Sequence, residues 1–247
     1  MLKQRTRALV GAYAVVSVVQ VTCEGLDATA AAGVAQVLLM PVLAAALLAE
    51  RPAPRSRLVT LTLAALVASW GGDLLPRFLD GDPAFLAMVG CFLVAQACYI
   101  AAFRPYRRAS IMHTSKAWLA AYAVVVLGLI GVCLPGAGVL APAVVVYGLA
   151  LGTMAVLATG VDRVAWAGGA FFLVSDGLIA IDAFTDLRSS DVAVMATYVV
   201  AQLLLVLGVI RRDATPAPAG SPASSARGSS AAPDPRRTTA PPATPAP

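Results

Sequence analysis

The sequence predicts an all-α protein: a polytopic membrane bundle of eight transmembrane helices with both termini cytoplasmic. Apolar residues make up 59% of the chain and charged residues 13%, and its mean hydropathy is +0.81. A soluble domain of ordinary composition carries about twice that share of charged residues. Apolar windows long enough to cross a bilayer recur along the chain, and basic residues gather in alternate connections between them.

The eight windows are separated by short segments that contain proline or charged residues. They cover approximately residues 8–23, 29–49, 58–75, 84–103, 117–134, 139–158, 164–184 and 192–210. The first window follows the basic segment MLKQRTR, as the apolar part of a signal peptide would. No A-x-A cleavage site comes after it, so we interpret it as a helix that is kept.

Lysine and arginine placement sets the expected orientation. With the N-terminus inside, the outer loops carry two basic residues, Arg77 and Arg188. The inner segments carry Lys3, Arg5, Arg7, Arg51, Arg55, Arg57, Arg104, Arg107, Arg108, Lys116, Arg163, Arg211 and Arg212. We therefore expect a multi-pass protein of the cell's cytoplasmic membrane with both ends inside.

The composition changes after Arg212 to proline, alanine, serine and threonine, with almost no large apolar residue. Such a segment buries too little surface to offset the entropy lost on ordering. The sequence thus predicts a transmembrane domain over residues 1–212 and a disordered cytoplasmic tail over residues 213–247.

Two aspartates, Asp73 and Asp176, lie inside the third and seventh windows. A carboxylate near the bilayer centre costs roughly 2.5–3.5 kcal/mol on insertion scales, so such residues usually face the protein interior and have a function. The alternative is a pair of structural carboxylates that only hydrogen-bond to neighbours. At 1.5 Å per residue, both aspartates lie roughly 20 Å from the inner ends of their helices.

Other polar residues, Gln20 and Gln36 among them, occupy neighbouring depths, which predicts one polar cavity that opens toward the outer leaflet. The candidate substrate-binding or cavity-lining residues are Ser69, Gln96, Tyr99, Tyr147, Ser175, Tyr198 and Gln202. Each glutamine or tyrosine alone is more typical of helix–helix hydrogen bonding, and only the cluster indicates a site.

Several other kinds of chemistry are disfavoured by what the sequence contains. The single histidine, His113, falls in a basic inner loop, and the four cysteines lack zinc-ligand spacing, so no metal and no cofactor are expected. No window carries a G-x-S-x-G motif, which disfavours a serine hydrolase. No basic run with interleaved aromatics points to a nucleic-acid partner.

Polar and small residues recur in a fixed order along the windows. They form Ser69-x-x-Gly72-Asp73, Gly90-x-Phe92-x-x-x-Gln96-x-x-Tyr99, Tyr147, the segment from Gly169 to Asp176, and Tyr198-x-x-Ala201-Gln202. Taken in order, these motifs resemble the YhhN-type lysoplasmalogenases, a family of eight-span membrane hydrolases, over roughly residues 8–210. The resemblance implies cleavage of the vinyl-ether bond of a lyso ether phospholipid to a fatty aldehyde and a glycerophospho-alcohol. It also implies that Asp73 and Asp176 are catalytic.

The chain departs from the family pattern at two positions. Gln96 stands where the family often has histidine, and Met40-Pro41 stands where many members have Lys-Pro. The first change removes one possible proton donor, and the second implies altered contacts with the lipid head group.

The implied chemistry suits an aspartate pair. Vinyl-ether hydrolysis needs one carboxylic acid to protonate the β-carbon and one carboxylate to activate water. Two carboxyl groups in one site titrate as a pair, so either aspartate can be the acid. The alternative hypothesis is a proton- or cation-coupled transporter or lipid carrier that uses the same carboxylates. The oligomeric state stays open.

Overall fold

The computed structural model describes residues 2–214, and the predicted all-α class is confirmed. Within that range the chain folds into α1 (Gln4–Gly25), α2 (Thr29–Glu50), α3 (Arg57–Leu74), η1 (Leu75–Phe78), α4 (Asp82–Phe103), η2 (Arg104–Ala109), α5 (Ile111–Thr114), α6 (Lys116–Ala137), η3 (Gly138–Leu140), α7 (Ala141–Ala158), α8 (Arg163–Phe184) and α9 (Asp191–Ala214). The predicted tail lies outside the described residues, except that Asp213 and Ala214 belong to α9.

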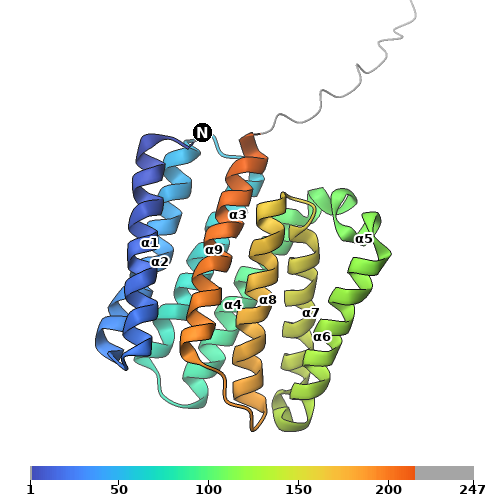
Figure 1. Cartoon of the computed structure of the whole chain (residues 1–247). Helices are drawn as coiled ribbons and strands as arrows, with labels where there is room; N and C mark the ends of the chain where they lie inside the picture. Colours follow the sequence, from blue (N-terminus) through green and yellow to red (C-terminus); the bar gives the residue numbers. More distant parts are fainter. Residues whose placement is uncertain (1, 215–247) are drawn as a thin grey trace, which may run out of the picture. The chain divides into compact units, whose positions relative to one another are not determined.

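Seven helical stretches in the described residues are long and apolar enough to cross a membrane. One of them, Lys116–Ala158, has 43 residues and comprises α6 and α7 joined through η3. These two helices lie side by side and run in opposite directions (Figure 1). The chain is therefore a multi-pass membrane protein.

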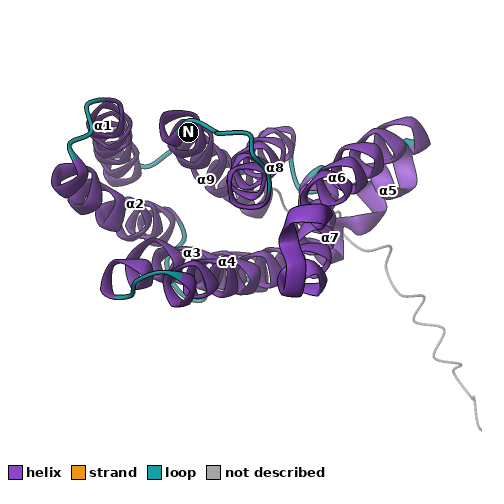
Figure 2. Cartoon of the chain, turned by 90° about the horizontal axis from the view of Figure 1, so that it is seen from below, coloured by secondary structure: helices purple, strands orange, loops and turns teal. Residues whose placement is uncertain are grey.

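The long helices form two layers (Figure 2). One layer contains α1, α9, α8 and α6, and the other contains α2, α3, α4 and α7. The pairs α1–α2 and α6–α7 join the layers at the two sides of the bundle. Helices α3 and α4 in one layer thus face α9 and α8 in the other, and the buried polar side chains lie on these four helices and their neighbours.

Small residues bring α8 and α9 into close contact. A Cβ atom at Gly168 would lie 2.7 Å from the backbone nitrogen of Leu205, and one at Gly208 would lie 2.6 Å from the Cβ of Ala165. Helices in a membrane pack closely through such small residues, because lipid gives no hydrophobic drive for their association. This contact fixes the height of Asp176 on α8 relative to Tyr198 and Gln202 on α9.

The N-terminus and the end of α9 lie at the same end of the bundle (Figure 1), which we call the basic end. It also holds the connections 51–56, 104–115 and 159–162, and therefore the thirteen basic residues assigned above to the inner side. The opposite end, the acidic end, holds Glu24, Asp27, Asp80, Asp82, Asp186 and Asp191 together with Arg77 and Arg188.

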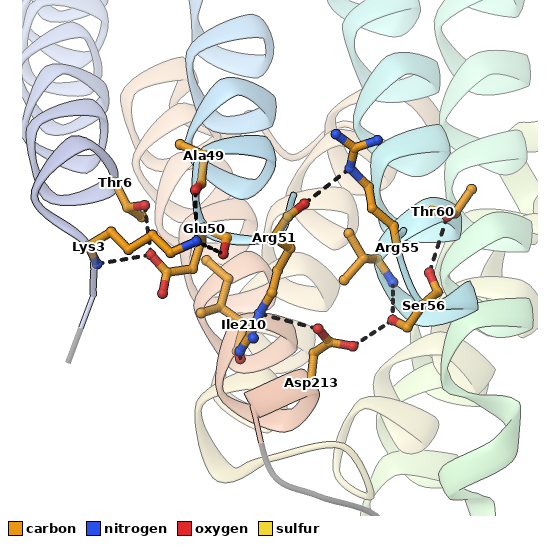
Figure 3. A network of polar contacts seen from close by, with 11 residues as sticks. Lys3, Thr6, Ala49, Glu50, Arg51, Arg55, Ser56, Thr60, Ile210 and Asp213 are labelled. Atoms are coloured by element: carbon orange, nitrogen blue, oxygen red, sulfur yellow. Dashed lines mark hydrogen bonds and ion pairs between the residues drawn. The ribbon is translucent and has the colours of Figure 1, made fainter. Parts of the chain in front are cut away.

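A polar network ties the helices together at the basic end (Figure 3). The Lys3 ammonium donates to the carbonyl of Glu50 at 2.8 Å, and Arg51 donates to the carbonyl of Ile210 at 2.6 Å and pairs with Asp213 at 3.2 Å. Ser56 caps α3 by accepting from the Val59 backbone N–H and also donates to Asp213. These contacts hold the start of α1, the α2–α3 connection and the end of α9 in place.

Candidate active site

Asp73 is the second-last residue of α3 and is 5% exposed. Its Oδ1 accepts a hydrogen bond from Gln36 Nε2 of α2 at 3.1 Å, and its Oδ2 accepts one from the Tyr198 hydroxyl of α9 at 2.9 Å. Three helices from both layers therefore meet at this carboxyl group.

Asp176 lies in the middle part of α8 and is also 5% exposed. Its Oδ2 accepts from Gln96 Nε2 of α4 at 3.0 Å and from the Tyr147 hydroxyl of α7 at 2.7 Å. Each buried aspartate thus receives one amide N–H and one phenol O–H. Among residues 2–214, neither carboxyl group forms an ion pair.

The two aspartates lie at similar heights in the bundle. Asp73 comes 16 residues after Arg57 and Asp176 comes 13 residues after Arg163, which gives about 24 Å and about 20 Å from the basic ends of α3 and α8 at 1.5 Å per residue. The heights agree with those expected from the sequence.

A third polar group lies one helical turn from Tyr198, toward the basic end. The Gln202 side chain accepts from the Tyr99 hydroxyl at 2.8 Å and donates to the Ser69 hydroxyl at 3.0 Å. This group joins α3, α4 and α9, with all three side chains fully buried. It holds in place the helices that carry Asp73, Gln96 and Tyr198.

Phe92 of α4 packs against neighbours of Asp73 and shares a pocket with Asp176. Its ring packs edge-to-face with the Tyr198 ring at 5.7 Å between centroids and lies against Gly72, the residue before Asp73. Its other neighbour is Phe172 of α8, at 6.4 Å. Phe92 also lines a pocket that reaches Asp176.

This pocket lies between α4, α6, α7 and α8 and is narrow, with a cavity volume of about 70 Å³. Asp176 and Tyr147 are polar lining residues at its inner end, while its walls are mostly aliphatic or aromatic side chains, including those of Met88, Phe92, Ile130, Leu151, Ile179 and Phe184. Leu86, at the pocket's rim, is 49% exposed, so the pocket reaches the surface of the bundle.

The arrangement differs in two respects from the single polar cavity predicted from the sequence. The pocket is lined by Asp176 and Tyr147 but not by Asp73, Gln96, Tyr198 or Gln202, whose side chains instead fill the packed interior with their mutual hydrogen bonds. The Ser175 hydroxyl donates to the Val194 carbonyl of α9 at 3.0 Å and so serves helix packing.

Three relevant residues were absent from the predicted site: Gln36, Phe92 and Arg77. Gln36 was counted among the polar residues at the depth of Asp73 but not among the candidate site residues. Phe92 was noted only as part of a motif. Nothing in the sequence marked Arg77 as a site residue, because a single arginine in an outer loop is common.

Comparison with known proteins identifies the family. The model of the YhhN family matches residues 31–209. The chain belongs to the YhhN family. A rat protein named lysoplasmalogenase TMEM86B is 33% identical over 181 residues, which cover 72% of this chain and 73% of the relative. A mouse protein of the same name is 32% identical over 175 residues, which cover 69% of this chain and 73% of the relative. No solved structure matches the chain.

Family membership and these two relatives show that the protein is a membrane hydrolase. The transporter or carrier alternative is not favoured, because both relatives are named as enzymes.

Proposed function

We propose that this YhhN protein hydrolyses the vinyl-ether bond of lysoplasmalogen-type lipids within the membrane, giving a fatty aldehyde and a glycerophospho-alcohol. The observation that carries the proposal is the apolar pocket whose inner end holds a buried carboxyl group and a phenol, Asp176 and Tyr147. An unbranched alkenyl chain suits such walls, and the reacting group at its end requires acid–base chemistry. The names of the two relatives support the same substrate class.

The proposed reaction uses Asp73 and Asp176 as the acid–base pair. One carboxylic acid adds its proton to the β-carbon of the vinyl ether, and the resulting oxocarbenium ion is attacked by water that gives a proton to the other carboxylate. The hemiacetal then collapses to the aldehyde as its hydroxyl returns a proton to the first carboxylate, while the second carboxyl group protonates the departing glycerol oxygen. One water is consumed for each C–O bond broken, and both carboxyl groups regain their starting states. The negative carboxylate also stabilises the cationic intermediate.

The hydrogen-bond donors around each aspartate have a positioning role in this proposal. Tyr147 and Gln96 orient the Asp176 carboxyl group, and Tyr198 and Gln36 orient that of Asp73. The buried Oε1 of Gln96 has no hydrogen-bond donor in the described residues. A buried acceptor without a donor costs about 1–3 kcal/mol, so a substrate hydroxyl or the attacking water is a suitable partner for this atom.

A substrate that uses both aspartates has to extend from the pocket past Phe92 toward Asp73. Phe92 packs against Gly72 and Tyr198 and also lines the pocket, so its ring fills the space between the surroundings of the two carboxyl groups and has to move when such a substrate binds.

We also propose eight membrane crossings, with α6 and α7 counted separately, and a cytoplasmic location for the basic end. Both helices have at least 18 residues, and thirteen basic residues stand at one end of the bundle against two at the other. The acidic end then faces the outside of the cell membrane.

The test of the reaction uses the purified full chain in detergent or nanodiscs, without added metal. A 1-alkenyl lysophospholipid should release aldehyde, whereas the 1-alkyl analogue with the same chain and head group should stay intact, because its saturated ether has no double bond to protonate. Absence of aldehyde from the alkenyl lipid, or transport of intact lipid alone, would refute the proposal.

A further inference from the structure

Among residues 2–214, Arg77 is the basic residue of the acidic end that forms no ion pair with a carboxylate. The other one, Arg188, has Asp182 as an ion-pair partner at 3.7 Å. The Arg77 guanidinium instead donates to the neutral side-chain oxygen of Gln36, at 2.5 Å, and Arg77 is exposed. Because Arg77 is exposed, an anion that approaches from this end can reach its guanidinium group.

The position of Arg77 is built into the helices around it. Arg77 belongs to the 3-10 helix η1, which has Pro76 in its first turn and directly follows α3. Its guanidinium lies over Gly33 of α2, where a Cβ atom would overlap the guanidinium nitrogen. The absence of a side chain at residue 33 therefore allows the guanidinium to lie directly against α2.

A short chain of hydrogen bonds connects this charge to the proposed reaction. Gln36 accepts from Arg77 through its oxygen and donates through its nitrogen to Asp73 Oδ1 at 3.1 Å. One amide group thus separates the guanidinium from the carboxyl group. In a glycerol ether lipid, three carbons separate the ether oxygen from the phosphate oxygen. This span is similar to the one that the Gln36 amide bridges between Arg77 and Asp73.

We propose that Arg77 binds the phosphate of the lipid head group, and so selects ether lipids with a phosphate over uncharged alkenyl glycerols. This inference rests on the proposed function. Guanidinium groups bind phosphate through paired, charge-assisted hydrogen bonds that neutral amides cannot replace. With the phosphate at Arg77, the glycerol lies beside Gln36 and Asp73, and the alkenyl chain points toward the pocket at Asp176.

The experiment compares two substrates with the same alkenyl chain: a 1-alkenyl-glycerophosphoethanolamine and a 1-alkenyl-glycerol. In the full chain, Arg77→Gln should raise KM for the phosphate-bearing substrate by roughly tenfold, the loss typical of one hydrogen bond to a charged group. KM for the alkenyl glycerol should change by less than about twofold on the same scale. Arg77→Lys should recover part of the difference, and the matched control Arg188→Gln should leave both substrates unchanged.

Arg77 also orients Gln36, and the substrate ratio separates this role from phosphate binding. An equal loss on both substrates, or an unchanged ratio, would overturn the proposal and leave Arg77 as a positioning residue only. Glycerol 3-phosphate, which carries the phosphate without a chain, should inhibit the wild type only weakly. Strong inhibition that Arg77→Gln abolishes would instead identify a site for soluble phosphates.

Binding of saturated 1-alkyl analogues tests Arg77 without turnover. Arg77→Gln should weaken binding of the 1-alkyl lysophospholipid and spare that of the 1-alkylglycerol. This result would support the phosphate site even if hydrolysis failed, whereas equal affinities of wild type and variant for the lysophospholipid would reject it.

Discussion

The surroundings of Asp73 and Asp176 can be compared directly, because each carboxyl group accepts one hydrogen bond from a glutamine and one from a tyrosine. They differ in what lies beyond those donors. Beyond Gln36 lies the exposed charge of Arg77, close to the acidic end. Beyond Tyr147 lies an apolar pocket between four helices.

A similar set of hydrogen bonds can thus serve opposite ends of one amphipathic substrate. A lysolipid has a charged head and an apolar chain, and the reacting ether lies between them. We infer that Asp73 works on the head-group side and Asp176 on the chain side, with Phe92 between them. The predictions below test this assignment in order of expected effect on activity.

The largest effect should come from Asp73→Asn and Asp176→Asn. Asparagine keeps the volume of the side chain but cannot exchange the proton, so each change should lower kcat by about 10²–10⁴-fold, the usual contribution of acid–base catalysis. Aldehyde release measures the loss, and circular dichroism checks that the helices persist. Asp186→Asn, in the loop before α9, is the control and should keep full activity. Losses below tenfold would contradict the acid–base roles.

The helices themselves were largely predictable, because hydropathy reports which segments cross the bilayer. The window 164–184 begins one residue after α8 begins and ends with it. The first window was too short, since α1 continues through Arg5 and Arg7. Backbone hydrogen bonds need no apolar side chains, so charged residues at the basic end extend the helix beyond the hydrophobic window.

The pairing of polar side chains was not predictable from depth. Hydropathy carries no information about which helices are neighbours in the bundle, and the donors to Asp73 come from the second and eighth windows. For the same reason the sequence placed both aspartates in one cavity, whereas the pocket contains Asp176 alone of the two. The gathering of basic residues at one end was predictable because it depends only on the order of the segments, and the membrane orientation stays a prediction.

Filling the pocket at Asp176 tests whether the alkenyl chain of the substrate binds there. Ala180→Phe places a ring among the pocket walls of α8, and overpacking of this kind typically costs about 1–3 kcal/mol. We expect roughly a tenfold lower kcat/KM for a long-chain substrate and a smaller loss for a short-chain one. The matched control is Ala183→Phe, an exposed position on the same helix outside this pocket. Equal losses for both chain lengths would show that the chain binds elsewhere.

A smaller effect should follow from removing either phenol hydroxyl. Tyr147→Phe and Tyr198→Phe each leave one aspartate with its glutamine alone, and a hydrogen bond inside a membrane protein contributes about 0.6–1.7 kcal/mol. We expect a threefold to roughly twentyfold lower kcat in each case on that scale. Tyr122→Phe is the control, because its hydroxyl accepts from Trp166 rather than contacting an aspartate. If only one of the two variants lost activity, the aspartates would not be equivalent partners.

The basic end should affect stability without affecting the reaction. Ser56→Ala removes the cap of α3 and the hydrogen bond to Asp213, and loss of such a cap costs about 1 kcal/mol. A lower thermal midpoint in detergent with unchanged kcat and KM at a permissive temperature is the expected outcome. A changed KM would instead connect this end to substrate binding.

The central claim is that one lipid lies with its phosphate near Asp73 and its chain near Asp176. Photo-crosslinking with a non-hydrolysable 1-alkyl lysophospholipid measures this most directly, using one probe labelled in the alkyl chain and one labelled in the head group. The chain label should react with pocket residues of α4, α6, α7 and α8, and the head-group label with α2 and η1 near Gln36 and Arg77. Both labels on the same segments, or the chain label on α1 and α2, would contradict the account.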